Sequence, residues 1–165
     1  RKMLMFGFDS FKGLPKISKK DTLISSETYK NKKKWVEGQM NISQKDVENL
    51  FDSHCMDNTK YKLISGFYKD KLTRETLKIL GIKKSAIVNI DCDLYDSTLT
   101  ALNFIKPTLQ TGTILIMDDY FHFRGDKKLG EAGALNKFLK DNPNISVVSY
   151  LQYGVAGKVF IVNIN

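Results

Sequence analysis

The sequence has few of the residues that build disulfide frameworks or zinc sites. Among its 165 residues are two cysteines and two histidines. A closed zinc site usually needs four ligands, and His54 and His122 lack paired spacing, so we expect neither a zinc site nor a disulfide scaffold around Cys55 and Cys92. This cysteine usage fits a reducing, cytoplasmic setting.

Long apolar runs are also missing. The longest, such as residues 113–117 and 159–162, fall far short of the roughly 20 residues that cross a bilayer, so we expect no membrane span. The 11 glycines never form a Gly-x-Gly-x-x-Gly cluster, which excludes the usual glycine-rich dinucleotide loop within this chain.

Acidic residues are outnumbered by basic ones. The 26 Lys and Arg against 18 Asp and Glu give a net charge of +8, which favours acidic partners such as phosphate or an anionic glycan. Much of the excess comes from Lys19, Lys20 and residues 32–34, and such a lysine run is usually a solvated face or loop. We therefore expect no nucleic-acid partner.

The pattern of apolar runs indicates the fold class. Four short runs, interspersed with helix-period segments, are typical of βαβ units and a parallel sheet: residues 3–8, 61–65, 86–90 and 114–117. Two further β-rich runs, residues 147–153 and 158–164, predict an antiparallel pair that closes the sheet edge. The length fits one domain, so we expect residues 1–165 to form a single α/β domain with a doubly wound, mostly parallel sheet.

Helix boundaries have clear signals. Ser43 followed by Asp46 resembles a reciprocal cap, and Gly81 is expected to end a helix in a left-handed conformation. A third helix is expected to begin near Asp96, which we interpret as its cap, and a fourth to cover residues 131–139.

Acids follow two of the expected strands directly. Asp91 comes after residues 86–90, and Asp118 and Asp119 come after residues 114–117. Ligands of a doubly wound sheet bind outside the carboxyl ends of its strands, and neighbouring strands stand about 4.8 Å apart. These carboxylates can therefore share one cation, and hard oxygen ligands favour Mg²⁺. The alternative is that the acids only fill turns and caps.

Asp93 lies two residues beyond the strand end. We expect its side chain to face the following helix or the substrate rather than the Asp118 and Asp119 pair.

Three motifs carry a resemblance to a known family. Residues 8–15 (FDSFKGLP), 91–98 (DCDLYDST) and 118–120 (DDY) resemble the macrocin O-methyltransferase (TylF-like) family, in the right order and across almost the whole chain. The resemblance implies a Rossmann-like class I methyltransferase fold. It also implies methylation of a sugar-type hydroxyl by S-adenosylmethionine with Mg²⁺ assistance, on a small-molecule or glycan acceptor.

The resemblance also implies roles for individual acids. Asp91, Asp118 and Asp119 match the metal carboxylates, and Asp91 combines metal binding with proton acceptance at the catalytic centre. His122 lies two residues beyond the end of the DDY motif. It is a second catalytic candidate, as a base or a hydrogen-bond donor. A lone loop histidine is more often neither.

The cofactor site is implied in the same way. Asp9 matches the acid near the cofactor ribose, with Ser10 beside it, although Asp9 also suits a turn. Gly66 and Phe67 occupy the place where such enzymes contact adenine, with Asp91 completing the set. Phe67 is equally interpretable as a core residue.

The start of the chain departs from the family. The strand and loop that normally precede Met3 are missing, so we expect a domain that lacks the amino-terminal cofactor-loop segment, a longer natural protein and an incomplete pocket beside Asp9. Acceptor specificity is expected in residues 15–39, with Trp35 and Tyr29 as a substrate lid or a packed surface segment, and in residues 121–130.

Two other functions stay open at this point. One is a metal-dependent glycosyltransferase that uses Asp91-Cys92-Asp93 to hold a metal on a nucleotide-sugar. The other is a non-catalytic α/β binding module. A homo-oligomer is compatible with any of these.

Overall fold

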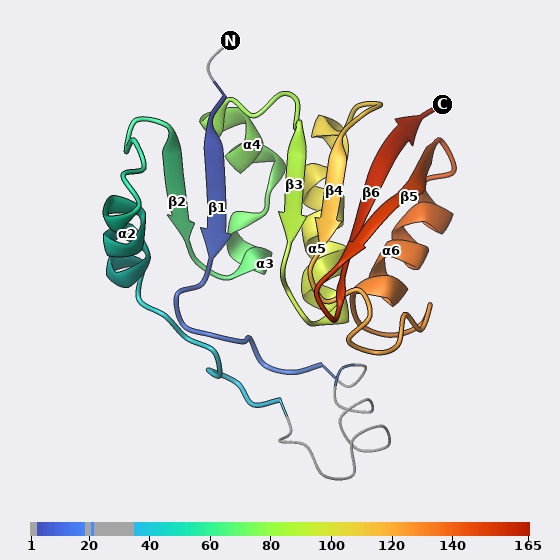
Figure 1. Cartoon of the computed structure of the whole chain (residues 1–165), viewed down its shortest axis with the longest axis horizontal. Coiled ribbons are helices and arrows are strands. Elements are labelled where there is room, and N and C mark those ends of the chain that lie inside the picture. Colours follow the sequence, from blue (N-terminus) through green and yellow to red (C-terminus); the bar gives the residue numbers. More distant parts are fainter. Residues whose placement is uncertain (1–2, 19–20, 22–34) are drawn as a thin grey trace.

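The computed structural model describes residues 3–18, 21 and 35–165 (Figure 1). Strands and helices alternate along the chain, as the sequence predicts. In order they are β1 (Met5–Asp9), α2 (Gln44–Ser53), β2 (Tyr61–Ser65), α3 (Tyr68–Lys71), α4 (Arg74–Leu80), β3 (Ile87–Ile90), α5 (Tyr95–Ile105), the 3₁₀ turn η1 (Lys106–Thr108), β4 (Ile114–Met117), α6 (Gly130–Asp141), β5 (Ile145–Tyr153) and β6 (Gly157–Ile164).

The strands form two sheets. β1 pairs with β2 in parallel, while β3, β4, β6 and β5 follow one another in a four-stranded sheet. Within that sheet β3 and β4 are parallel, and β6 runs antiparallel to both β4 and β5. The predicted antiparallel pair is thus confirmed, with β5 at the sheet edge and β6 inside the sheet.

β1 and β3 are edge strands of their respective sheets. Figure 1 shows the two strands side by side, with the same direction. The ring of Phe8 in β1 contacts the ring of Phe104 in α5 with centroids 5.1 Å apart, so β1 packs against α5 at this position.

Helix ends largely follow the expected signals. Ser43 caps α2 by accepting a hydrogen bond from the Asp46 backbone N–H at 3.1 Å, and Gly81 ends α4 with φ of 67°. The expectation for Asp96 is wrong. α5 begins one residue earlier, at Tyr95, and Leu94 is its N-cap residue. Asp96 lies inside the first turn, where the helix dipole still favours a negative charge.

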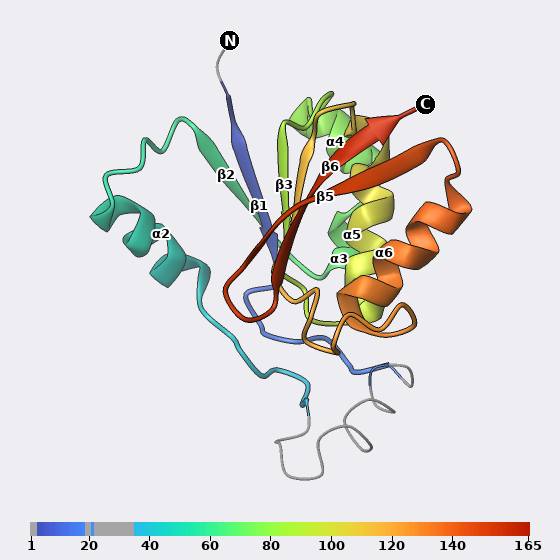
Figure 2. The same ribbon diagram turned by 45° about the vertical axis from the view of Figure 1, so that its right-hand side comes forward.

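One face of the four-stranded sheet is covered by α5 and α6, as the turned view in Figure 2 shows. The core between them contains Leu102, Leu115, Met117, Phe138 and Val162, all almost completely buried. This packing fixes the carboxyl ends of β3 and β4. In the part of the chain that the structure describes, no helix is long and apolar enough to span a bilayer.

Candidate metal and cofactor site

The carboxyl ends of β3 and β4 are aligned. Ile90 pairs with Met117 in the parallel register, and the Asp118 N–H donates to the Ile90 carbonyl at 3.0 Å. Because both strands end at this level, Asp91 and Asp118 are the first residues beyond them. The expected convergence of two acidic loops is therefore present.

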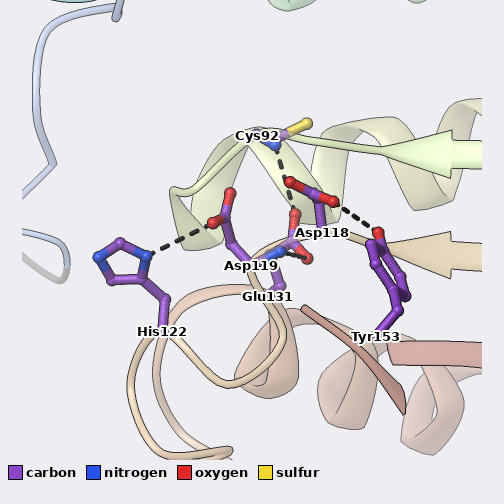
Figure 3. A network of polar contacts seen from close by, with 6 residues as sticks. All are labelled: Cys92, Asp118, Asp119, His122, Glu131 and Tyr153. Atoms are coloured by element: carbon purple, nitrogen blue, oxygen red, sulfur yellow. Dashed lines mark hydrogen bonds and ion pairs between the residues drawn. The ribbon is translucent and has the colours of Figure 1, made fainter. Parts of the chain in front are cut away.

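Among the described residues, three side chains from these loops form a group that could hold a metal ion. One ligand atom from each of Asp93, Asp119 and His122 lies within 4.8 Å of the others. His122 Nδ1 lies 3.4 Å from Asp119 Oδ1, and Figure 3 shows the imidazole facing that carboxylate.

The expected orientation of Asp93 is wrong. A carboxylate oxygen of Asp93 lies within 4.8 Å of one of Asp119, so the side chain faces a member of the pair that we expected it to avoid. Asp93 has φ of 55°, a left-handed conformation that non-glycine residues seldom adopt. Strand alternation cannot foresee such a change in chain direction.

The pKa values of Asp93 and Asp119 shift in opposite directions. Burial and the nearby charge of Asp119 raise the pKa of Asp93 to about 7. Burial acts in the same direction on Asp119, but hydrogen bonds from His122 and Asp93 outweigh it and lower the pKa of that carboxyl. These opposite shifts make Asp93 the easier of the two carboxyl groups to protonate.

Asp91 and Asp118 lie beside this group. Burial raises the pKa of Asp91, and the charges of Asp118 and Asp119 add to the effect. Asp118 Oδ1 accepts a hydrogen bond from the Tyr153 hydroxyl at 2.5 Å. Of the three predicted metal ligands, Asp119 belongs to the group with Asp93 and His122, and the full set with Asp91 and Asp118 stays a prediction.

Glu131, in the first turn of α6, was missed by the sequence analysis. Its side chain is almost fully buried, and its two oxygens accept the backbone N–H groups of Cys92 at 3.3 Å and Asp119 at 3.1 Å (Figure 3). Burial raises the pKa of Glu131 to about 8. An acid at the start of a helix that follows an acidic loop was the available signal, since such a position points toward the strand ends.

A cavity of about 570 Å³ opens next to the acidic loops. Its lining includes four of the predicted cofactor residues: Asp9, Ser10, Phe67 and Asp91. Gly66, the fifth, is not among the lining residues. Its N–H donates to the Asp9 carbonyl at 2.9 Å, so it acts in the turn beyond β2.

Asp9 also has a local role. Its Oδ1 accepts the Phe11 N–H at 2.5 Å, which is the turn geometry that the sequence left open. Beside it, the Tyr68 hydroxyl donates to the Phe8 carbonyl at 3.3 Å and accepts a hydrogen bond from the Cys92 thiol at 3.6 Å. Tyr68 therefore connects the end of β1 with the loop after β3.

Trp35 lies against the acidic group. Its ring contacts the His122 ring with centroids 5.5 Å apart. Tyr29 and the lysines at positions 19, 20 and 32–34 lie outside the described residues. The lid expectation for the segment therefore stays a prediction, with Trp35 as its described part.

Comparison with known proteins identifies the family. A family model described as macrocin O-methyltransferase (TylF) matches residues 1–139. A Streptomyces olivaceus 8-demethyl-8-(2,3-dimethoxy-alpha-L-rhamnosyl)-tetracenomycin-C 4'-O-methyltransferase is 27% identical over 112 residues, which cover 68% of this chain and 40% of the relative. Mycinamicin III 3''-O-methyltransferase from Micromonospora griseorubida is 27% identical over 113 residues, which cover 68% of this chain and 42% of that relative. The chain thus spans about two fifths of the length of these curated relatives.

Solved structures share the fold. The structure of the O-methyltransferase NovP superposes with a TM-score of 0.71 at 20% identity. The superposition covers 98% of this chain and 60% of the NovP chain. The calicheamicin methyltransferase CalS11 superposes with a TM-score of 0.70 at 22% identity. The superposition covers 96% of this chain and 60% of the CalS11 chain. The Rossmann-like methyltransferase fold expected from the sequence is therefore confirmed, and the chain belongs to the macrocin O-methyltransferase (TylF) family.

Proposed function

We propose that the protein containing this chain is an S-adenosylmethionine-dependent O-methyltransferase that acts, with Mg²⁺ assistance, on a sugar-type hydroxyl of a small molecule or glycan. The observation that carries the proposal is the meeting of two acidic loops at the ends of β3 and β4, beside a cavity lined by Asp9 and Phe67. The names of the relatives supply the acceptor class, because one includes a rhamnosyl-bearing compound and another is a 3''-O-methyltransferase.

The residues fit a hard divalent cation. Carboxylate oxygens are the ligands that Mg²⁺ prefers, and Asp91, Asp118 and Asp119 supply them from two adjacent strand ends. The raised pKa of Asp91 reflects mutual repulsion as well as burial, and a cation would relieve that repulsion. When bound, Mg²⁺ supplies charge that orients the acceptor oxygens and makes a hydroxyl easier to deprotonate.

The chain's own side chains account for proton transfer and cofactor orientation. Asp91 and His122 remain the candidates for accepting the hydroxyl proton. Asp9 would accept hydrogen bonds from ribose hydroxyls through the oxygen not used by Phe11. S-adenosylmethionine supplies the methyl group as a sulfonium, and holding the reactants in line contributes about 7 to 11 kcal/mol.

We also propose that the domain is completed by a segment outside these 165 residues. The adjacent edges of β1 and β3 have the same direction and would each pair with one parallel strand inserted between them. Such a strand would end beside Asp9 and would close the open cavity there. Cytoplasmic localisation and homo-oligomerisation stay predictions.

Calorimetry with S-adenosylmethionine on the full-length protein tests the cofactor part. Asp9→Ala should weaken binding by about 1.5 to 3 kcal/mol, the range for hydrogen bonds to a charged group. Asp52→Ala, an exposed acid on α2, is the matched control and should bind as the parent does. Unchanged affinity in Asp9→Ala would remove Asp9 from the site.

The metal part is tested by activity. Asp118→Asn and Asp119→Asn should lose most methyl transfer while remaining folded, because asparagine keeps the shape and removes the charge. Asp141→Asn, on the exposed surface of α6, serves as the control. Full activity in excess chelator would contradict the metal assignment. Glycosyl transfer from a nucleotide-sugar, without methyl transfer, would favour the glycosyltransferase alternative.

A further inference from the structure

The loop between β3 and α5 has a conformation that needs support. Asp93, at its centre, is a non-glycine residue with φ of 55°, and the Leu94 N–H turns back to the Cys92 carbonyl. A left-handed conformation of this kind costs about 1 to 3 kcal/mol and persists only where the surroundings hold it. Some contact outside the loop must therefore fix it.

Glu131 supplies one such contact, at the start of the loop. One carboxylate oxygen accepts the Cys92 N–H and the other accepts the Asp119 N–H, so a single buried side chain ties the loop after β3 to the loop after β4 (Figure 3). Only 1% of Glu131 is exposed. Both oxygens accept backbone N–H groups, so Glu131 holds the two loops to one another.

Asp21 supplies the second contact, at the end of the loop. Its Oδ1 accepts the Tyr95 N–H at 2.9 Å across 74 residues of sequence, and its Oδ2 accepts the Ser18 hydroxyl at 2.8 Å. Tyr95 is the first residue of α5, whose own N-cap residue, Leu94, has no side-chain oxygen to offer. Asp21, which is 2% exposed, thus performs from a distance the capping that a local Ser or Asp would provide.

We propose that Asp21 and Glu131 are positioning residues that clamp the loop from both ends, and so hold the Asp93 carboxylate against Asp119 and His122. Divalent-cation affinity should therefore depend on two side chains that do not touch the cation, and this readout rests on the proposed function.

The variants are chosen to separate the clamp from general stability. Asp21→Ala removes the acceptor for the Tyr95 N–H, while Asp21→Asn keeps an oxygen there and should rescue it. Glu131→Gln keeps the shape but retains only one acceptor for two N–H groups. Phe138→Leu, in the core side of α6, is the control that lowers stability without touching either loop.

Mn²⁺ affinity, measured by calorimetry on the full-length protein, is the first readout. Asp21→Ala and Glu131→Gln should each weaken it by about tenfold, as loss of a residue that orients metal ligands typically does. The double variant should lose less than the product of the two effects, because both hold the same loop. Asp21→Asn and Phe138→Leu should bind as the parent does.

Hydrogen exchange is the second readout and needs no metal. The amides of Cys92 and Tyr95 should exchange slowly in the parent and faster in the matching variants, with the inner amides of α5 and α6 unchanged. Parental affinity and parental exchange in both variants would overturn the clamp, as would an equal loss of affinity in Phe138→Leu. If the parent binds no Mn²⁺, the proposed metal function fails, and the exchange rates still decide the clamp.

Discussion

Tyr153, the last residue of β5, donates its hydroxyl hydrogen to Asp118 Oδ1 at 2.5 Å (Figure 3). The contact joins the antiparallel strand pair to the acidic loop after β4, across 35 residues. Burial raises the pKa of the Tyr153 hydroxyl, and the charge of Asp118 adds to the rise, so the hydroxyl keeps its proton and remains a donor. The orientation of Asp118 is thus set by a strand that the acidic motifs do not include.

Removing this hydroxyl tests its influence on the metal site. In Tyr153→Phe the ring packing is retained and Asp118 loses the partner that orients it, so Mg²⁺ affinity should fall by about tenfold. Unfolding should become easier by no more than about 1.5 kcal/mol, the usual net contribution of one hydrogen bond. Calorimetry and thermal unfolding measure the two effects. Tyr150→Phe, an exposed tyrosine on the same strand, is the control, and equal affinity in both variants would contradict the prediction.

Gly157, on the neighbouring strand β6, leaves room for the ring of Tyr153 because it has no side chain. It pairs with Tyr153 in the β5–β6 register, and a Cβ at this position would collide with the tyrosine ring. Gly157→Ala should therefore displace the ring, lower the free energy of unfolding by about 1 to 3 kcal/mol and weaken Mg²⁺ binding as Tyr153→Phe does. Gly154→Ala, where a Cβ would meet open space but φ is 54°, separates backbone strain from this collision. Retained Mg²⁺ affinity in Gly157→Ala would show that the ring adapts.

The strands were predictable because their signals are local. Residues 61–65 and 114–117 are strands at the bounds that the apolar runs gave, and the two acidic motifs do meet at neighbouring strand ends. The start of α5 was not predictable in this way. Its first N–H is capped by Asp21, 74 residues earlier, and no local signal reports a contact over that distance.

Glu131 was missed, and the orientation of Asp93 was predicted wrongly, for a similar reason. A glutamate in the first turn of a helix is normally exposed, and its burial here follows from contacts with loops 39 and 12 residues away. Asp93 takes a left-handed conformation without being glycine, which a residue pattern does not reveal. Acids at strand ends can thus be read from the sequence, while the side chains that orient them depend on tertiary contacts.

The two cysteines should differ in reactivity. Cys55 is exposed, whereas Cys92 is buried beside Tyr68, and burial raises the pKa of the Cys92 thiol to about 12. At pH 8 a disulfide reagent should modify the Cys55 thiol rapidly. It should modify the Cys92 thiol only as fast as local unfolding exposes it. Mass spectrometry over time measures both rates, and Cys55→Ser should abolish the rapid phase. Equal rates for the two thiols would contradict the buried position of Cys92.

The last prediction concerns stability and pH in the absence of divalent cations. The pKa of Glu131 rises from 4.5 to about 8 on folding, so between these values the folded protein holds a proton that the unfolded chain has lost. Stability should therefore fall as pH rises through this window, by up to about 1.4 kcal/mol per pH unit for this group. The pKa of Asp93 is raised to about 7, so this group also lowers stability as pH rises, but mainly below pH 7.

The difference between pH 7 and pH 8 thus belongs mainly to Glu131, and Glu131→Gln isolates it. Glutamine cannot ionise, so the variant should lose less stability than the parent between pH 7 and pH 8. Urea unfolding in chelator, at half-unit pH steps, gives both curves. Parallel curves across this interval would mean that Glu131 ionises at its ordinary pKa despite its burial. The two N–H groups that it accepts would then compensate for its desolvation, and the buried carboxylate would be a permanent negative charge beneath the acidic loops.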